Sequence, residues 1–133
     1  MRVVKDKFDN KLAILIDREN IPKDLHFYTE EHDNIQVGTW NYNTGKLLPA
    51  HNHNFVNRDL NRTQECVIPL SGRVQVELFD ELDEFVVELE IGVNSILICF
   101  AGGHQYRILD ENTVCIEVKS GPYPGLDLDR RRF

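Results

Sequence analysis

The sequence lacks an excess of positive charge. Fifteen Lys and Arg residues stand against 22 Asp and Glu residues, so the 133-residue chain carries a net charge of -7. A surface that binds the phosphates of a nucleic acid or of an anionic membrane needs an excess of basic groups. We therefore expect neither nucleic acid nor a membrane among the partners of this protein.

Cysteine pairs and long apolar runs are missing as well. The three cysteines, Cys66, Cys99 and Cys115, are an odd number at wide spacing, without a C-x-x-C pair, which disfavours a disulfide framework or a zinc ribbon. No run approaches the ~20 apolar residues that cross a bilayer, and charges interrupt the apolar residues of the first ten positions, unlike those of a signal peptide. We predict a cytoplasmic protein with reduced cysteines, of which Cys99 and Cys115 are small core residues.

Sustained helical periodicity is also absent, and short runs rich in Val, Ile, Phe and Thr predict an all-β fold. In the clearest run, Val74, Val76 and Leu78 alternate with polar residues, as in a strand with one buried face. Turn residues between the runs favour hairpins between successive strands, and a short helix is expected only near 22–26. The predicted strands are 12–16, 35–42, 46–53, 65–70, 73–79, 84–89, 95–100, 104–109 and 113–118.

The length and composition indicate a single domain, 1–133. An apolar share of 41% and a charged share of 28% are those of an ordinary folded chain. The predicted strands define a core of about 35–118, with an N-terminal arm, 1–34, and a tail, 119–133. The apolar run 12–16 would be a liability as a free edge strand, so we expect a second subunit to cover it in a homodimer.

Two histidines, His51 and His53, form the most informative motif. In a strand, residues i and i+2 point to the same face about 6–7 Å apart, so both imidazoles could reach one metal ion. Glu65 and His104 are the natural further ligands, because imidazole and carboxylate groups together suit a divalent transition metal. An H-x-H pair in a β protein is also often a surface pair or a satisfied core histidine, so the spacing alone leaves metal binding open.

The spacing of these residues resembles the motifs of the cupin superfamily. Its first motif, G-x5-H-x-H-x3,4-E-x6-G, is matched by 45–53 (GKLLPAHNH) and by 65–72 (ECVIPLSG), with the eleven residues 54–64 in place of three or four. Its second motif, G-x5-P-x-G-x2-H-x3-N, is matched more loosely by Gly92 and His104, without the motif's Pro or Asn. The resemblance extends over roughly 38–118.

The cupin resemblance implies a single-domain jelly-roll β-barrel. It also implies a divalent transition metal, namely Zn, Mn, Fe, Ni or Co. The segment 117–125 is similar to the end of small single-domain cupins, which are commonly dimers and for which the resemblance implies no substrate. The implied metal ligands are His51, His53, Glu65 and His104.

Three functions remain open at this point. The first is a metalloenzyme, of isomerase or oxygenase type, that acts on a small polar or anionic substrate such as a sugar or an organic acid. The second is a binding module that captures such a small molecule without turnover. The third is an enzyme like the metal-free sugar ketoisomerases, in which the His pair acts as bases, but the R-G-x-H-A-H context of that branch differs from 48–53 (LPAHNH) here.

Other side chains could take part in binding or catalysis. Tyr106 shares a strand face with His104, so its hydroxyl could act as an acid near a ligand or could simply anchor the core. Arg62 and Arg58 lie in the insertion 54–64, where a guanidinium could hold a substrate carboxylate or phosphate, although most loop arginines are solvated.

Overall fold

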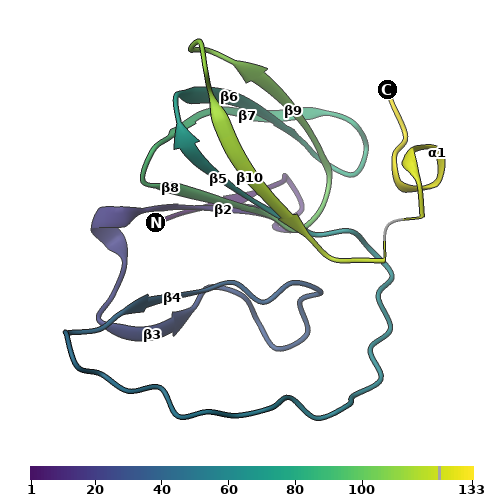
Figure 1. The fold of residues 1–133 in the computed structure, drawn as a ribbon. Coiled ribbons are helices and arrows are strands. Elements are labelled where there is room, and N and C mark those ends of the chain that lie inside the picture. Colours follow the sequence, from purple (N-terminus) through teal and green to yellow (C-terminus); the bar gives the residue numbers. More distant parts are fainter. Residues whose placement is uncertain (123) are drawn as a thin grey trace.

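The structure, a computed structural model, describes residues 1–122 and 124–133 as an antiparallel β sandwich (Figure 1). The five-stranded sheet has the order β1-β2-β8-β5-β10, the three-stranded sheet the order β7-β6-β9, and β3 and β4 form a separate pair. The strands are β1 (Arg2–Lys5), β2 (Lys11–Asp17), β3 (Asp24–Phe27), β4 (Gly38–Asn41), β5 (Glu65–Ser71), β6 (Arg73–Phe79), β7 (Phe85–Gly92), β8 (Ser95–Cys99), β9 (Gly103–Ile108) and β10 (Val114–Lys119).

Helix is limited to two short pieces of the described chain. These are the 3-10 helix η1 (Arg18–Asn20) and the four-residue α1 (Leu126–Asp129). Within the described residues, no helix has the length and apolar character that crossing a membrane requires. The all-β prediction is confirmed.

The main core lies between the two larger sheets. Val74, Val76 and Leu78 of β6 are at most 2% exposed and pack against residues of the five-stranded sheet such as Leu97. The alternation seen in the sequence is therefore the inward face of β6. Burying each such side chain stabilises the folded state by about 1.5–3 kcal/mol.

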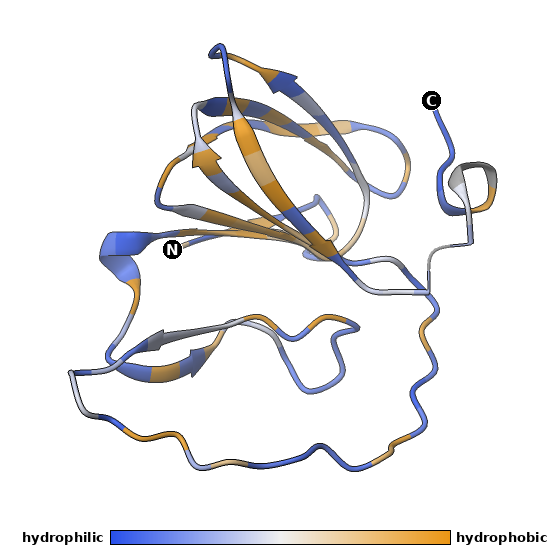
Figure 2. Cartoon of the chain, in the orientation of Figure 1, coloured by the Kyte–Doolittle hydropathy of each residue, from blue (hydrophilic) through white to orange (hydrophobic). Residues whose placement is uncertain are grey.

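The five-stranded sheet is buried on its other face as well. Ile14, Ile16 and Ile98 form a second cluster with Tyr28 and Ile35, which lie in the connection between β3 and β4. A strand covered on both faces needs a continuous apolar run, and this explains the sequence LAILI in β2. Figure 2 shows apolar residues concentrated in β2, β5 and β8.

The position of β2 removes one reason for expecting a homodimer. We predicted that 12–16 would be a free edge needing a second subunit, but β2 is paired with β1 on one side and with β8 on the other. The run therefore packs within the chain. The sequence predicts an edge strand here because β1, which lies in the predicted N-terminal arm 1–34, has no strand pattern of its own.

Two further local predictions are wrong. The expected strand 46–53 does not form: the described residues 42–64 contain neither helix nor strand. Pro49 gives this stretch no backbone donor at its centre, and no neighbouring strand is paired with it. The expected helix near 22–26 is replaced by β3, which pairs with β4, so sheet pairing overrides the helix-opening tendency of Pro22.

The prediction of successive hairpins also fails for most connections. Consecutive strands pair in β1–β2, β3–β4 and β6–β7, whereas β5, β8 and β10 of one sheet alternate along the chain with β6, β7 and β9 of the other. The turns after β5, β7, β8 and β9 thus carry the chain across the sandwich. Because the described sheets share no paired strand, they form an open sandwich and not a closed barrel.

Candidate functional site

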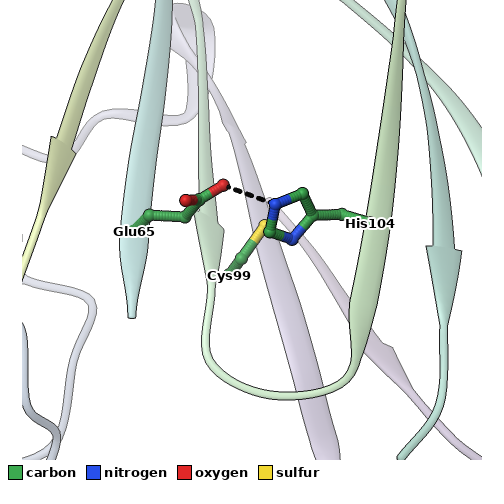
Figure 3. Close-up of side chains that lie close together, drawn as sticks. All are labelled: Glu65, Cys99 and His104. Atoms are coloured by element: carbon green, nitrogen blue, oxygen red, sulfur yellow. Dashed lines mark ion pairs between the residues drawn. The ribbon is translucent and has the colours of Figure 1, made fainter. Parts of the chain in front are cut away.

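Three side chains with metal-binding atoms converge at one end of the sandwich (Figure 3). Glu65 begins β5, Cys99 ends β8 and His104 lies at the start of β9. Glu65 and Cys99 are direct partners in the β5–β8 register, while His104 reaches them from the facing sheet. One carboxylate oxygen, the thiol sulfur and one imidazole nitrogen all lie within 4.8 Å of one another.

A hydrogen-bond network holds the carboxylate of Glu65. His104 Nε2 lies 3.0 Å from Glu65 Oε1, and the Tyr106 hydroxyl donates to the same oxygen over 2.9 Å. Cys99 Sγ is 3.9 Å from the Tyr106 oxygen. Glu65 is only 6% exposed, so this buried charge depends on these partners.

The turn before β9 aims His104 into the site. Gly102 has a φ of +73°, and a Cβ at this position would lie 2.1 Å from the carbonyl oxygen of Phe79. Only glycine fits such a left-handed turn against a neighbouring backbone. The chain can therefore cross from β8 to β9 in a few residues, and strand alternation then places His104 and Tyr106 on the same face.

Burial beside Glu65 keeps the neighbouring thiols and the phenol of Tyr106 protonated at neutral pH. Desolvation, followed by the negative charge of Glu65, raises the pKa of the Cys99 thiol to about 12. The same two causes raise the pKa of Cys66 to about 11. Burial also raises the pKa of Tyr106 above its usual range, so this phenol remains a hydrogen-bond donor at neutral pH.

The network opens into a cavity of about 950 Å³. Glu65, Cys99, His104 and Tyr106 line it, and so does Arg62. This volume lies within the range of about 300–1,000 Å³ that is typical of small-molecule sites. The network is thus accessible to a ligand from one side.

Four of the residues singled out in the sequence lie at this cavity. Glu65, His104 and Tyr106 contact one another, and Arg62 lines the wall, where it donates to Glu81. Arg58, the other arginine proposed for substrate binding, is exposed within the strandless stretch 42–64 and is not among the residues that line the cavity.

The histidine pair lies away from these residues. His51 and His53 contact each other edge to face, with ring centroids 5.2 Å apart, and His51 Nδ1 is 3.0 Å from the carbonyl oxygen of Pro49. Both are exposed in the stretch 42–64, and neither belongs to the group around Glu65. Their expected place beside His104 depended on a strand at 46–53, which this structure does not form.

Cys99 is the site residue that the sequence interpretation missed. We predicted a small core residue, and its thiol is indeed buried, but it faces Glu65 and Tyr106. The register that pairs Glu65 with Cys99 joins residues 34 positions apart, so no local pattern shows it. The equivalent prediction for Cys115 is wrong, because this cysteine is exposed on β10 at the edge of its sheet.

The donor set around Glu65 fits a divalent transition metal. Carboxylate, imidazole and thiolate groups together suit zinc and its neighbours, and ligand atoms of a tetrahedral site lie about 3.3–3.8 Å apart. The spread of up to 4.8 Å between the ligand atoms observed here is slightly wider. Because the Cys99 thiol is protonated, binding would release a proton.

Comparisons of the chain with protein-family models, with curated proteins and with solved structures find no match.

Proposed function

We propose that this protein is a metal-binding cupin with a jelly-roll fold and that it is a metalloenzyme acting on a small polar or anionic substrate. The single observation that supports this most strongly is the convergence of Glu65, Cys99 and His104 within 4.8 Å at the base of a cavity. The cupin motifs of the sequence place two of these residues, Glu65 and His104, in the ligand set. The third, Cys99, comes from the structure.

The proposed metal is held by side chains from both sheets. When bound, a divalent transition metal ion would supply Lewis-acid chemistry to a substrate oxygen. Tyr106 orients the Glu65 carboxylate through its 2.9 Å hydrogen bond, as the outer hydrogen-bond partners of metal ligands commonly do. The pKa of Tyr106 is raised by burial, so at neutral pH the phenol retains the single proton that it donates to Glu65 beside the cavity.

The histidine pair has a place in this proposal through the free edge of β9. Among the described strands β9 pairs with β6 alone, so the backbone groups along its other edge are available. The stretch 46–53 is not a strand in this structure. We propose that it pairs with this edge only when the metal binds, and that this change brings His51 and His53 beside His104. The resulting four-stranded sheet would be that of a jelly roll, and the histidines would complete a set of four or five ligands.

Elemental analysis by plasma mass spectrometry tests the metal. Untagged protein purified without chelator or added metal is expected to contain close to one equivalent, and His104→Ala is expected to lose it. His32→Ala is the matched control, because it removes an exposed imidazole whose nearest ionic partner is Glu30. Metal retained in the His104 variant, or lost equally in the control, contradicts the proposed site.

The hydrogen-bonded group Glu65–His104–Tyr106 also favours a second candidate, an acid–base enzyme without a metal. The 3.0 Å contact pairs a carboxylate with an imidazole, and the 2.9 Å bond adds a phenol that retains its proton. Such a group can move protons on a sugar or a hydroxy acid. A sample free of metal, in which added sugar phosphates exchange carbon-bound hydrogen with deuterium from solvent and His104→Ala does not support the exchange, favours this candidate.

A further inference from the structure

Residues 129–133, called the strap below, lie along one wall of the cavity that contains Glu65 and His104. Arg131 donates two hydrogen bonds to Asp83, of 2.9 and 2.7 Å. The Phe133 ring stacks edge to face on Phe79 with the centroids 5.2 Å apart. An ion pair and an aromatic contact thus attach the strap to the three-stranded sheet and the turn that follows β6.

Two further contacts fix the position of the strap. Thr63 Oγ1 donates to Asp129 Oδ1 over 3.1 Å, and Lys119 Nζ lies 3.4 Å from the other oxygen of that carboxylate. A Cβ on Gly103 would come within 2.7 Å of the Phe133 ring, so the missing side chain lets the ring lie directly against the start of β9. The strap is therefore a built wall of the cavity, one residue away from His104.

The acidic groups of this cavity are all occupied by partners within the chain. Glu65 is held by Tyr106 and His104, Glu81 by Arg62, and Asp83 by Arg131. Asp80 accepts the backbone N–H groups of Leu82 and Glu84. Asp129 and Glu117 both lie within ion-pair distance of Lys119.

Two cations of the strap have no such partner. Arg130 and Arg132 line the same cavity, and no ion pair or hydrogen bond involves their side chains within the described part of the chain. Both stand out in a protein whose net charge is -7. Arg130 and Arg132 are therefore guanidiniums of the cavity lining that remain available to bind an incoming anion.

We propose that Arg130 and Arg132 form an anion-binding wall and that the ligand of the cavity is a small organic anion with a carboxylate or phosphate group. The planar guanidinium forms paired hydrogen bonds with either group. The inference deepens the proposed function, on which it rests for what the rest of the ligand does, since the anion would lie next to Glu65 and His104. The binding step itself involves the strap and not the metal.

The test measures binding of inorganic phosphate and of succinate to the full chain by calorimetry, with a chelator present to keep the protein free of metal. Amide NMR signals of Gly103 and Phe133 report whether binding occurs at the strap. Both probes, or one of them, are expected to bind saturably. Arg130→Gln/Arg132→Gln is expected to weaken that binding at least about tenfold, the usual effect of losing charge-assisted hydrogen bonds.

Arg2→Gln/Arg18→Gln is the matched control, because it removes the same charge from exposed positions outside the cavity. It is expected to change the binding less than about twofold, which is the size of a general charge effect. Binding of phosphate alone identifies a phosphorylated ligand, and binding of succinate alone identifies a carboxylate. No saturable binding of either probe by about 50 mM, or equal weakening in both double variants, overturns the inference.

The result is separable from that of the metal analysis. If the protein purified without chelator contains no metal, and the chelator-treated protein binds the anion, the strap inference is supported and the metalloenzyme proposal is overturned. Stoichiometric metal without anion binding supports the metal site and overturns the strap inference. The two results are independent because His104→Ala removes the metal and leaves Arg130 and Arg132 in place.

Discussion

The hydroxyl of Tyr106 on β9 donates to Glu65 on β5 over 2.9 Å and so links the two sheets across the open end of the sandwich. The Glu65 side chain is buried, and burial raises the pKa of Tyr106, which retains the donated proton. A hydrogen bond to a buried charged group contributes about 1.5–3 kcal/mol, more than a neutral bond at the surface. The Tyr106–Glu65 hydrogen bond therefore stabilises the fold and also holds the Glu65 carboxylate in the site.

Tyr106→Phe should lower the free energy of unfolding by about 1–3 kcal/mol, because it leaves a buried carboxylate with one partner fewer. Urea denaturation in the presence of a chelator measures this loss without a contribution from metal. Tyr42→Phe is the control, since it removes a hydroxyl for which no hydrogen bond is found within the described chain. Equal stability of the two variants contradicts a structural role for the Tyr106–Glu65 bond.

Cys99→Ser should remove the sulfur-to-metal charge-transfer absorption of the protein loaded with Co²⁺. A thiolate ligand gives this near-ultraviolet band, whereas carboxylate and imidazole ligands do not. Cys115→Ser should keep the band, because that cysteine is exposed on β10 and lies outside the Glu65 group. A band that persists in the Cys99 variant shows that Cys99 does not bind the metal.

Leu97→Ala should lower the free energy of unfolding by about 2–5 kcal/mol, because the side chain is completely buried between the sheets and its removal leaves a cavity there. Leu47→Ala should be nearly neutral, since Leu47 is 78% exposed in the strandless stretch. Thermal unfolding followed by circular dichroism compares the two. A large loss in the Leu47 variant shows that this stretch packs on the sandwich in solution.

The ion pair that anchors the strap should respond to acid. The guanidinium of Arg131 holds the pKa of Asp83 below its ordinary value of 3.8. A folded-state pKa that is lowered stabilises the folded state above the unfolded pKa, and this contribution is lost as the pH falls through the lowered value. The strap is thus expected to be anchored at neutral pH and to loosen below about pH 4.

Carbon-detected NMR of the Asp83 carboxylate measures this titration. Arg131→Gln should move the midpoint upward toward 3.8, and the Phe133 ring signals should change over the same pH range in the unaltered chain. Arg132→Gln, which removes a neighbouring charge but not the ion pair, should leave the midpoint nearly where it was. A midpoint that is the same in all three proteins rules out the Asp83–Arg131 pair as the anchor.

The sequence predicts correctly those strands whose polar and apolar residues alternate in the way that their position in the fold requires. β6 matches its predicted bounds, 73–79, because its two faces differ in polarity. The strand 46–53 was predicted as one of the short runs between turn residues, and it does not form. β1 and β3 were missed because short strands of mixed polarity owe their conformation to the partners β2 and β4.

The site divides in the same way. Glu65, His104 and Tyr106 were predicted because motif spacing and strand alternation are local properties of the chain. Cys99 and the strap could not be predicted, because the first depends on the register between β5 and β8 and the second on contacts with Asp83 and Phe79. Such long-range pairings carry no periodic signal in the sequence.

The strandless stretch 42–64 gives the chain a natural place to be split. A protease that cuts within it would separate β1–β4 from β5–β10, yet β2 would remain paired with β8 over five residue pairs, Ala13 with Cys99 through Asp17 with Ser95, and buried on both faces. The two pieces should stay together without a covalent link. Produced separately, they form a complementing pair whose reassembly restores the sandwich and, with it, the cavity.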